Sequence, residues 1–242
     1  WKGPSTKKGR FPIRFEDWEH MLGGDGYFCQ VDPTNNRWLY AESQNGSLSK
    51  VDMRTGRRKG IRYRGSDLRF NFDAPLLISP HNSDVIYHGA NVLLRSSFQG
   101  ESWEVVSPDL STNDPERREV GPLAYGTLTT FDESPVRQGV IWAGTDDGNV
   151  QVTRDGGKSW SNVIDNVPGM PARDIWVSRV EASHFDEGTC YLTFDGHRSG
   201  LFTPWVFKTT DYGRTWTNIS SNLPDGQPVY VIKEDLKNPD LL

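Results

Sequence analysis

The sequence predicts an all-β protein built from repeated four-stranded units, and three observations support this. The pattern S/T-x-D-x-G-x-S/T-W occurs at residues 153–160 and 209–216, and residues 96–103 keep every position except the Asp. The central glycine of this pattern recurs after 57 and then 56 residues. No stretch shows a sustained helical period. A fixed period of this size indicates units that pack on their neighbours, because one unit cannot bury its apolar face alone.

The repeated pattern is typical of a tight hairpin turn. The carboxylates of Asp155 and Asp211 can accept backbone N–H bonds within the turn, and a glycine two positions later supplies a positive φ. The Trp that ends each copy is expected to anchor the outgoing strand in the core. The residues assigned to these structural turns are Asp155, Gly157, Trp160, Asp211, Gly213, Trp216, Gly100 and Trp103.

A second recurring segment supplies the first two strands of each unit. It consists of an apolar strand, a turn with Pro or Asp, and a strand that closes on an aromatic residue, as in Ile78-Ser-Pro80 followed by Val85-Ile-Tyr87. In the third unit the expected strands are residues 126–131, 139–144, 150–153 and 159–164. Four short antiparallel strands per unit are typical of a β-propeller blade. A β-sandwich is the alternative, but it does not predict one turn motif at a fixed spacing.

The first and last units depart from the pattern. Asn45-Gly46 predicts a two-residue hairpin, and residues 52–56 form another turn where the other units carry the motif. Residues 15–21 predict one short helical turn, and the fifth repeat begins at Val229 and stops before its second strand. We therefore expect residues 1–242 to be a single partial β-propeller of about four blades plus the start of a fifth. Further blades, or a second polypeptide, would complete the ring.

The composition narrows the classes of function. Hydrophobic residues make up 35% and charged residues 24%, which is ordinary for a globular domain. The net charge of −5 argues against a broad nucleic-acid surface, and no apolar run approaches the ~20 residues that cross a bilayer. Neither a nucleotide-binding glycine loop nor a short-spaced His/Cys ligand set occurs, so we expect no metal and no cofactor.

The motifs resemble the Asp-box (BNR) β-propeller superfamily, and the wider sequence is most similar to bacterial sortilin-like and glycosyl-hydrolase-like propeller proteins. Beyond the turns, the resemblance is carried by residues 23–27, 107–111, 178–184 and 209–218. It implies a secreted or periplasmic protein with a peptide, protein or glycan ligand. It also implies that ligands bind on the face opposite the Asp-box turns.

The catalytic residues of the superfamily's enzymes find no clear match. A sialidase resemblance would imply an arginine triad and a Tyr–Glu pair, and neither can be assigned. An oligoxyloglucan-hydrolase resemblance would imply a catalytic Asp where this sequence has Ser43 or Gln44. We therefore expect a non-catalytic binding scaffold. The alternatives are an Asp-box glycoside hydrolase acting on a polysaccharide, and an assembly module that uses its open blade edge.

If the chain is a hydrolase, two pairs of carboxylates are candidates for acid/base work. Glu181 and Asp195 are the first pair, and Asp146 and Asp147 are the second. Retaining glycosidases separate their two carboxyl groups by about 5–5.5 Å and inverting ones by about 6.5–9.5 Å. Adjacent residues in a turn usually diverge, which counts against the second pair.

A ligand site is expected where the loop between the second and third strands of a blade meets the loop leading into the next blade. A glycan site needs aromatic platforms and polar side chains. Arg179 and Glu181 lie two apart on one strand and so face the same side, where an ion-pair network lining the central channel is the structural alternative. The candidate ligand-binding residues are Arg69, His88, Arg173, Trp176, Arg179, His197, Arg198, Trp205 and Tyr230.

Overall fold

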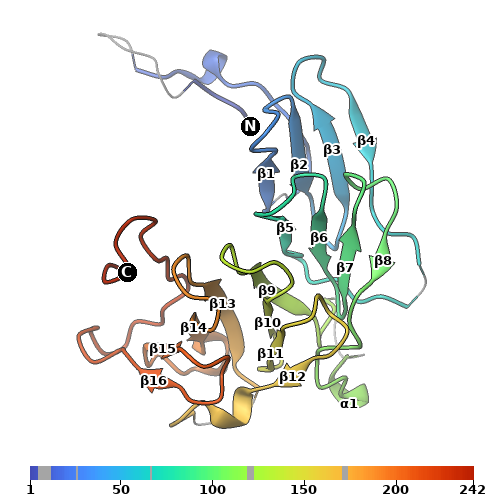
Figure 1. Ribbon diagram of the computed structural model, residues 1–242. Helices are drawn as coiled ribbons and strands as arrows, with labels where there is room; N and C mark the ends of the chain where they lie inside the picture. Colours follow the sequence, from blue (N-terminus) through green and yellow to red (C-terminus); the bar gives the residue numbers. More distant parts are fainter. Residues whose placement is uncertain (5–11, 26, 66, 119–122, 171–173) are drawn as a thin grey trace.

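A computed structural model of the chain describes residues 1–4, 12–25, 27–65, 67–118, 123–170 and 174–242. It contains four antiparallel four-stranded sheets, each made of consecutive strands (Figure 1). We number the sheets blades 1 to 4 in chain order. The predicted all-β, part-propeller architecture is confirmed.

Each blade is a meander whose strands are short. Blade 1 holds β1 (Cys29–Val31), β2 (Trp38–Glu42), β3 (Leu48–Asp52) and β4 (Arg58–Gly60); blade 2 holds β5 (Leu76–Ile78), β6 (Ile86–Gly89), β7 (Leu93–Ser96) and β8 (Glu104–Val105); blade 3 holds β9 (Leu128–Glu133), β10 (Ile141–Thr145), β11 (Val150–Thr153) and β12 (Ser161–Asn162); blade 4 holds β13 (Trp176–Ala182), β14 (Cys190–Asp195), β15 (Trp205–Thr209) and β16 (Thr217–Asn218). Helical turns in the described residues are η1 (Phe15–Asp17), α1 (Pro115–Arg118), η2 (Ile164–Asn166) and η3 (His197–Ser199). None of these is long and apolar enough to cross a membrane.

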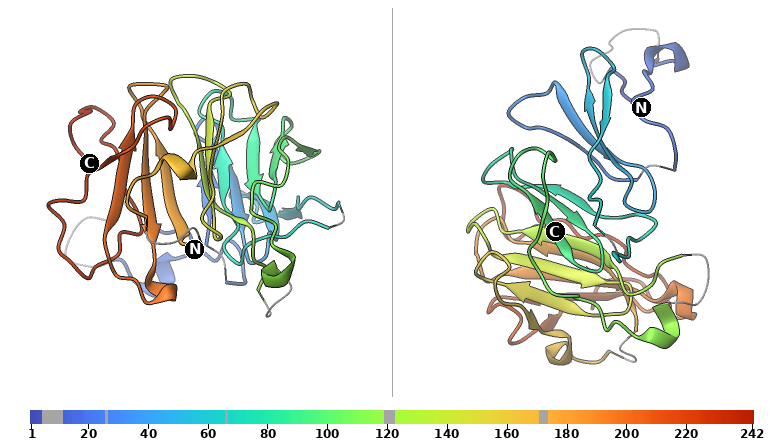
Figure 2. Two further views of the ribbon diagram at one scale, coloured as in Figure 1. Left: turned by 90° about the horizontal axis from the view of Figure 1, so that it is seen from below. Right: turned by 90° about the vertical axis from the view of Figure 1, so that its right-hand side faces the viewer.

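The first strand of each blade lies innermost, and neighbouring inner strands are bonded to one another. The Gln30 side chain of β1 donates to the Leu76 carbonyl of β5 (3.0 Å) and accepts from the Ile78 amide (2.7 Å). The Thr129 hydroxyl of β9 donates to the Val177 carbonyl of β13 (2.6 Å). The blades therefore follow one another in an arc, with blade 1 at one end and blade 4 at the other (Figure 2).

The two complete eight-residue motifs form the hairpin turn that they predict. In blade 3, Asp155 Oδ1 accepts from the Ser159 amide (2.9 Å), and the Thr153 hydroxyl donates to the same oxygen (2.8 Å). In blade 4, Asp211 accepts from the Thr215 amide at the same distance, 2.9 Å. Hydrogen bonds from the Ser159 side chain and amide lower the pKa of Asp155 to about 2, so this carboxylate stays ionised.

The motif glycine is also the point where each blade touches the preceding one. A Cβ added at Gly157 would lie 2.2 Å from the Val106 carbonyl oxygen, which is a collision. All three motif glycines have a positive φ. The nearest residue always directly follows the outermost strand of the preceding blade: Ile61 for Gly100, Val106 for Gly157 and Val163 for Gly213. The glycine thus serves blade packing as well as turn geometry.

The motif tryptophans tie the blades together, although they are not equally buried. Trp216 is buried against Trp142, with ring centroids 6.0 Å apart. Trp103 and Trp160 are only partly buried, because their indole nitrogens reach carbonyls at the edge of the preceding blade. Trp103 donates to Ile61 O at 2.7 Å and Trp160 to Val106 O at 3.3 Å.

A buried glutamate joins blade 3 to blade 2. Glu133, at the end of β9, accepts from the Ser79 hydroxyl (2.5 Å) and the Tyr87 hydroxyl (3.4 Å) of blade 2. All three side chains are buried. A carboxylate that satisfies two buried hydroxyls fixes the spacing between neighbouring blades.

The segment after blade 4 repeats this contact. Glu234 accepts from the Ser183 hydroxyl (3.0 Å), the Tyr191 hydroxyl (3.0 Å) and the His184 amide (2.6 Å). Residues 229–242 contain no assigned strand, yet they lie beside β13 on the open side of the arc (Figure 1). This segment therefore packs on blade 4 as blade 3 packs on blade 2.

The remaining local predictions concern the first blade and the N-terminal segment. Asn45 and Gly46 both have positive φ values, 55° and 73°, as the predicted hairpin requires. The Gly56 amide donates to the Asp52 carbonyl (2.8 Å) and closes the turn that replaces the motif. The predicted helical turn is the three-residue η1, and Met21 packs on the face of blade 1.

Candidate functional site

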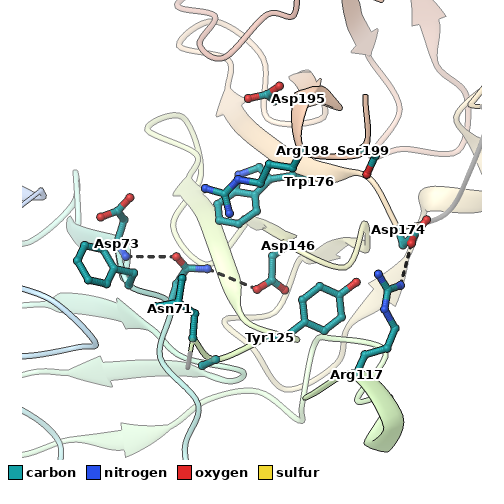
Figure 3. A pocket seen from close by; sticks show the side chains of 13 residues that line it. Asn71, Asp73, Arg117, Tyr125, Asp146, Asp174, Trp176, Asp195, Arg198 and Ser199 are labelled. Carbon is teal, nitrogen blue, oxygen red and sulfur yellow. Dashed lines mark hydrogen bonds and ion pairs between the residues drawn. The ribbon is translucent and has the colours of Figure 1, made fainter. Parts of the chain in front are cut away.

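A pocket of about 570 Å³ lies among the loops of blades 2, 3 and 4 (Figure 3). It is formed by loops leading into blades and loops between second and third strands, the two kinds of loop expected to share a face. Its polar and aromatic lining consists of Asn71, Phe72, Asp73, Arg117, Tyr125, Asp146, Asp174, Trp176, Asp195, Arg198 and Ser199.

Trp176 forms an aromatic wall of the pocket. It is the first residue of β13 and is half-buried. The Arg198 guanidinium lies over its ring, 4.0 Å from the centroid, and Figure 3 shows the two side chains against each other. A cation stacked on a partly exposed indole is held by about 1 kcal/mol, so a ligand ring could displace it or extend the stack.

Asp146 is a buried carboxyl group on the pocket wall. It accepts from the Thr127 amide (2.8 Å) and hydroxyl (2.7 Å), and from the Asn71 side chain (3.4 Å). Burial, with a smaller contribution from the neighbouring Asp147 charge, raises the pKa of Asp146 to about 6. Asp147 points the other way and accepts from the Thr112 amide and hydroxyl, both at 2.7 Å. The adjacent carboxylates diverge, as expected.

The position of Asp146 has a repeated structural task. In blades 1, 2 and 3 the second strand contains an aromatic residue, and the fourth residue after it accepts a hydrogen bond. The donor is a backbone N–H of the loop that leads into the same blade. These bonds join Asp25 N to Gln44 (3.2 Å), Arg69 N to Asn91 (3.0 Å) and Thr127 N to Asp146 (2.8 Å). The polar side chain at this position therefore fixes the leading loop.

Asp195 occupies the same position in blade 4 and bonds differently. Its carboxylate accepts from the His197 amide (3.0 Å) and bonds the His197 ring nitrogen Nδ1 (2.6 Å). Asp195 is itself buried, whereas half of the His197 side chain is exposed. A carboxylate that accepts from Nδ1–H leaves Nε2 of the imidazole available to a ligand. In blade 4 the carboxylate at this position therefore lines the pocket.

The rim between α1 and blade 4 is closed by an ion pair that sequence reasoning missed. Arg117 bonds Asp174 at 2.8 Å and lies over the Tyr125 ring, 4.7 Å from its centroid. The Tyr125 hydroxyl is buried and has no hydrogen-bond partner among the described residues. Burial raises the pKa of Tyr125 to about 12, so it remains a neutral donor. The repeat in the sequence was the signal that could have identified Tyr125, because Tyr125 lies in the loop leading into blade 3 and such loops were expected to form the ligand site.

The structure corrects the pairing of Glu181 with Asp195. In the β13–β14 register Asp195 lies opposite Trp176, and Glu181 is five residues further along β13. Five strand residues span about 16 Å, which exceeds the separation in either class of glycosidase. The two carboxylates therefore cannot act on one glycosidic bond.

Glu181 instead lines a narrow axial cavity of about 110 Å³, together with Arg179 and Lys233. It forms an ion pair with Lys233, as expected of a network lining the channel. Nε of Arg179 is buried there without a partner in the described part of the chain. Burial and the Glu181 charge raise the pKa of the nearby Asp132 to about 7. Arg179 and Glu181 thus lie apart from the pocket.

Two further candidate residues belong to the core, which corrects their assignment as ligand-binding residues. His88 is fully buried, 5.3 Å from the Phe70 ring and 6.1 Å from the Trp103 ring. Burial lowers the pKa of His88 to about 3, so it stays neutral. Trp205 is 5% exposed and packs in the blade 4 core. Neither side chain can reach a ligand on the loop face.

The other candidate residues separate into two groups. Arg69 donates to Tyr125 O (3.1 Å) and Gly126 O (3.0 Å) and pairs with Asp109 (2.8 Å), so it fixes the link into blade 3. Tyr230 is 42% exposed on the C-terminal segment, outside the pocket. Arg173 lies outside the described residues. The structure brings together Trp176, Asp195, His197 and Arg198.

No three His, Cys, Asp or Glu side chains within the described ranges are grouped so that they could hold a metal ion. The lining of the pocket offers hydrogen-bonding groups, charged groups and an aromatic ring. Its four carboxylates, Asp73, Asp146, Asp174 and Asp195, outnumber the two arginines that line it.

Comparisons with known proteins place the chain among propellers. No family model matches it. It is 23% identical over 218 residues to the oligoxyloglucan-reducing end-specific xyloglucanase of Emericella nidulans, covering 86% of this chain and 25% of that protein. The chain thus spans about a quarter of the length of this curated relative.

Two solved structures show the same fold at low identity. The GH74 xyloglucanase from Xanthomonas campestris aligns at a TM-score of 0.53 and 21% identity, over 85% of this chain and 32% of that one. The extracellular domain of the two-component system BT4673 from Bacteroides thetaiotaomicron aligns at a TM-score of 0.59 and 14% identity, over 89% of this chain and 25% of that one. These similarities show a propeller fold.

Proposed function

We propose that this chain is the ligand-binding part of a secreted or periplasmic Asp-box propeller, and that its pocket binds a glycan. The observation that carries the proposal is the Asp195–His197 pair beside the Trp176–Arg198 stack. Carbohydrate sites combine an aromatic face with a few fixed polar groups, and both are present on one pocket wall. Asp195 supports this further, because among the described residues its carboxylate bonds His197, whereas the side chain at its position in the other blades bonds the loop leading into its own blade.

The relatives support a glycan rather than a peptide or protein ligand. One is a xyloglucanase, and an auxiliary nutrient binding protein from Bacteroides thetaiotaomicron shares the fold at a TM-score of 0.53 and 8% identity. The sortilin-like reading, in which a peptide or protein is bound, is the competing form of the binding proposal. The chemistry of the pocket favours hydroxyl-rich ligands, because the excess of carboxylates provides many acceptors.

Glycoside hydrolysis is the second candidate, and the observation that favours it is Asp146. A carboxyl group with a pKa raised to about 6 is still partly protonated near neutral pH, as a general acid must be. Asp195 would then be the second carboxylate, across the pocket (Figure 3). In this mechanism Asp146 donates a proton to the leaving oxygen and Asp195 serves as base or nucleophile.

The binding proposal is tested by titrating the protein with neutral oligosaccharides, including xyloglucan fragments, by calorimetry. Trp176→Ala should weaken binding about fivefold or more, because ring stacking of this kind is worth about 1 kcal/mol. Tyr230→Ala is the matched control, since Tyr230 is an exposed aromatic outside the pocket. Equal affinities for the wild type and Trp176→Ala would exclude this pocket.

The same oligosaccharides separate binding from hydrolysis. If the chain is an enzyme, new reducing ends appear, and Asp146→Asn abolishes them while affinity is kept. If affinity is measurable and no reducing ends form, the site is a binding site only. If no oligosaccharide binds or is cleaved and peptides bind instead, the sortilin-like alternative holds.

We also propose that residues 1–242 form one domain, which further blades or a second polypeptide extend into a ring. The support is the Glu234 contact, which reproduces the Glu133 contact between blades 2 and 3. A protein that spans 25% to 32% of its relatives is consistent with this arrangement.

A further inference from the structure

The outer rim of blade 1 carries a dense group of exposed cations, which we call the basic ridge. The ridge follows the β3–β4 turn, strand β4 and the segment after it. Its members are Arg54, Arg57, Arg58, Lys59, Arg62 and Arg64, all of them exposed. Six cations in eleven residues are unusual in a chain of net charge −5.

Most of these charges are not neutralised by the protein. Lys59 forms an ion pair with Glu101, which belongs to the turn of blade 2. Arg58 donates to the His20 carbonyl (3.2 Å), and Arg62 lies over the Phe70 ring, 5.1 Å from its centroid. In the described part of the chain, no ion pair involves Arg54, Arg57, Arg58, Arg62 or Arg64. The ridge therefore presents an uncompensated positive field to solvent.

Protection of an edge strand does not account for the ridge. Charged side chains on an outer strand do prevent edge-to-edge pairing. The outer strands of the other three blades face the same risk, yet they read Glu104–Val105, Ser161–Asn162 and Thr217–Asn218. None of them contains a cation. The charge is specific to blade 1 and needs another explanation.

A groove of about 370 Å³ runs beside the ridge, between its end and the turn of blade 2. Lys59, Arg62, Tyr63 and Arg64 line it from the ridge. Glu101, which is paired with Lys59, and Trp103 line it from blade 2. The Trp103 indole donates to Ile61 O (2.7 Å), which fixes the backbone in the middle of the ridge. Cations and aromatic rings thus share one concave surface with a held backbone.

We propose that the basic ridge and its groove bind an acidic polysaccharide, a chain of sulfated or uronate sugars. Arginine forms paired hydrogen bonds with carboxylate and sulfate-like oxygens, and five of the six ridge cations are arginine. A polymer can follow the ridge from turn to groove, which a single small anion cannot. The choice of a polysaccharide over nucleic acid rests on the proposed location outside the cytoplasm. The site is independent of the pocket, whose carboxylates would repel such a chain.

The test compares two triple variants of the full chain for binding to heparin and to polygalacturonate, with neutral dextran as a blank. The ridge variant is Arg54→Gln, Arg57→Gln, Arg64→Gln, because these three side chains make no described contact that the fold depends on. The control variant is Lys158→Gln, Arg214→Gln, Lys237→Gln, three exposed cations on other parts of the chain. Both variants change the net charge equally. Unchanged thermal unfolding confirms that each is folded.

At about 50 mM salt we expect the ridge variant to bind at least tenfold more weakly than wild type, and the control to stay within about threefold. Wild-type affinity should fall steeply as salt rises, because binding releases condensed counterions.

Equal losses in the two variants would overturn the proposal by showing a non-specific charge effect. Absence of binding to both acidic polymers would also overturn it. Ridge-dependent binding of DNA with no binding of either polysaccharide would assign the ridge to nucleic acid instead. Neutral-oligosaccharide binding in the pocket should be the same in all three proteins.

Discussion

Asp146 combines a structural hydrogen bond with a raised pKa. In blades 1 and 2 the equivalent side chains are the amides of Gln44 and Asn91, which hold the leading loop without a charge. Blade 3 uses a carboxyl group for the same bond and buries it, which raises its pKa to about 6. A neutral amide would make the bond at lower cost. The raised pKa of this carboxyl group is what the proposed general-acid role requires.

The pH dependence of stability tests this at the residue scale. Because the pKa of Asp146 is raised above its unfolded value, its stabilising contribution is complete below about pH 4 and is lost as pH rises through about 6. A rise from 3.8 to about 6 corresponds to about 3 kcal/mol. Asp146→Asn does not titrate, so its free energy of unfolding relative to wild type should improve by roughly that amount between pH 4 and pH 7.5. Urea unfolding at several pH values measures it.

Asp155→Asn is the control for this measurement. The hydrogen bonds of the turn lower the pKa of Asp155 to about 2, so it is ionised throughout the range. The difference between Asp155→Asn and wild type should therefore stay constant above pH 5. A constant difference for Asp146→Asn as well would show that its carboxyl group is ionised at neutral pH and is not a proton donor.

At the scale of the element, the turn formed by residues 153–160 places two demands on one glycine. Gly156 and Gly157 are adjacent, and both have a positive φ, 73° and 97°. A Cβ on Gly156 would meet nothing within 4 Å, whereas one on Gly157 would lie 2.2 Å from the Val106 carbonyl oxygen. The first glycine serves the turn alone, and the second also lets blade 2 approach.

This difference predicts unequal costs for two neighbouring substitutions. Gly156→Ala should cost about 1 kcal/mol, the usual penalty for a side chain in the left-handed region. Gly157→Ala should cost at least about 2 kcal/mol more, because the backbone of blade 2 must move away. Thermal unfolding of both variants measures the difference. Equal costs would show that blade 2 can move away from Gly157 without loss of stability, and that the contact with the Val106 carbonyl does not restrict this position.

Sequence reasoning reached the turns and blades because each is specified locally. The Asn45-Gly46 hairpin and the Asp155 turn depend on residues within one loop. It failed for His88 and for the Glu181–Asp195 pair, because burial and separation there depend on strand register and on neighbouring blades. Tyr125 was missed for the same reason: its place in the pocket results from three blades meeting.

At the scale of the whole molecule, Glu234 tests whether the C-terminal segment unfolds together with the blades. It is buried and accepts from the Ser183 and Tyr191 hydroxyls and the His184 amide. Glu234→Ala would leave these donors without a hydrogen-bond partner. We expect the free energy of unfolding to fall by about 1–3 kcal/mol for the first unpaired donor, and by less for any donor that water can reach. Asp240→Ala, at an exposed position of the same segment, is the control and should cost less than about 0.5 kcal/mol.

If the segment is integral, the loss measured by urea unfolding of Glu234→Ala should appear in a single transition, and amide exchange should speed up in β13 and β14 together. If the segment is only an attached tail, exchange should speed up within residues 229–242 alone, and the unfolding of the four blades should be unchanged. The Glu133 contact between blades 2 and 3 favours the first outcome, because an equivalent pair of hydroxyl bonds, from Ser79 and Tyr87, already joins two complete blades there. Glu234→Ala should then destabilise blade 4 itself, and not only residues 229–242.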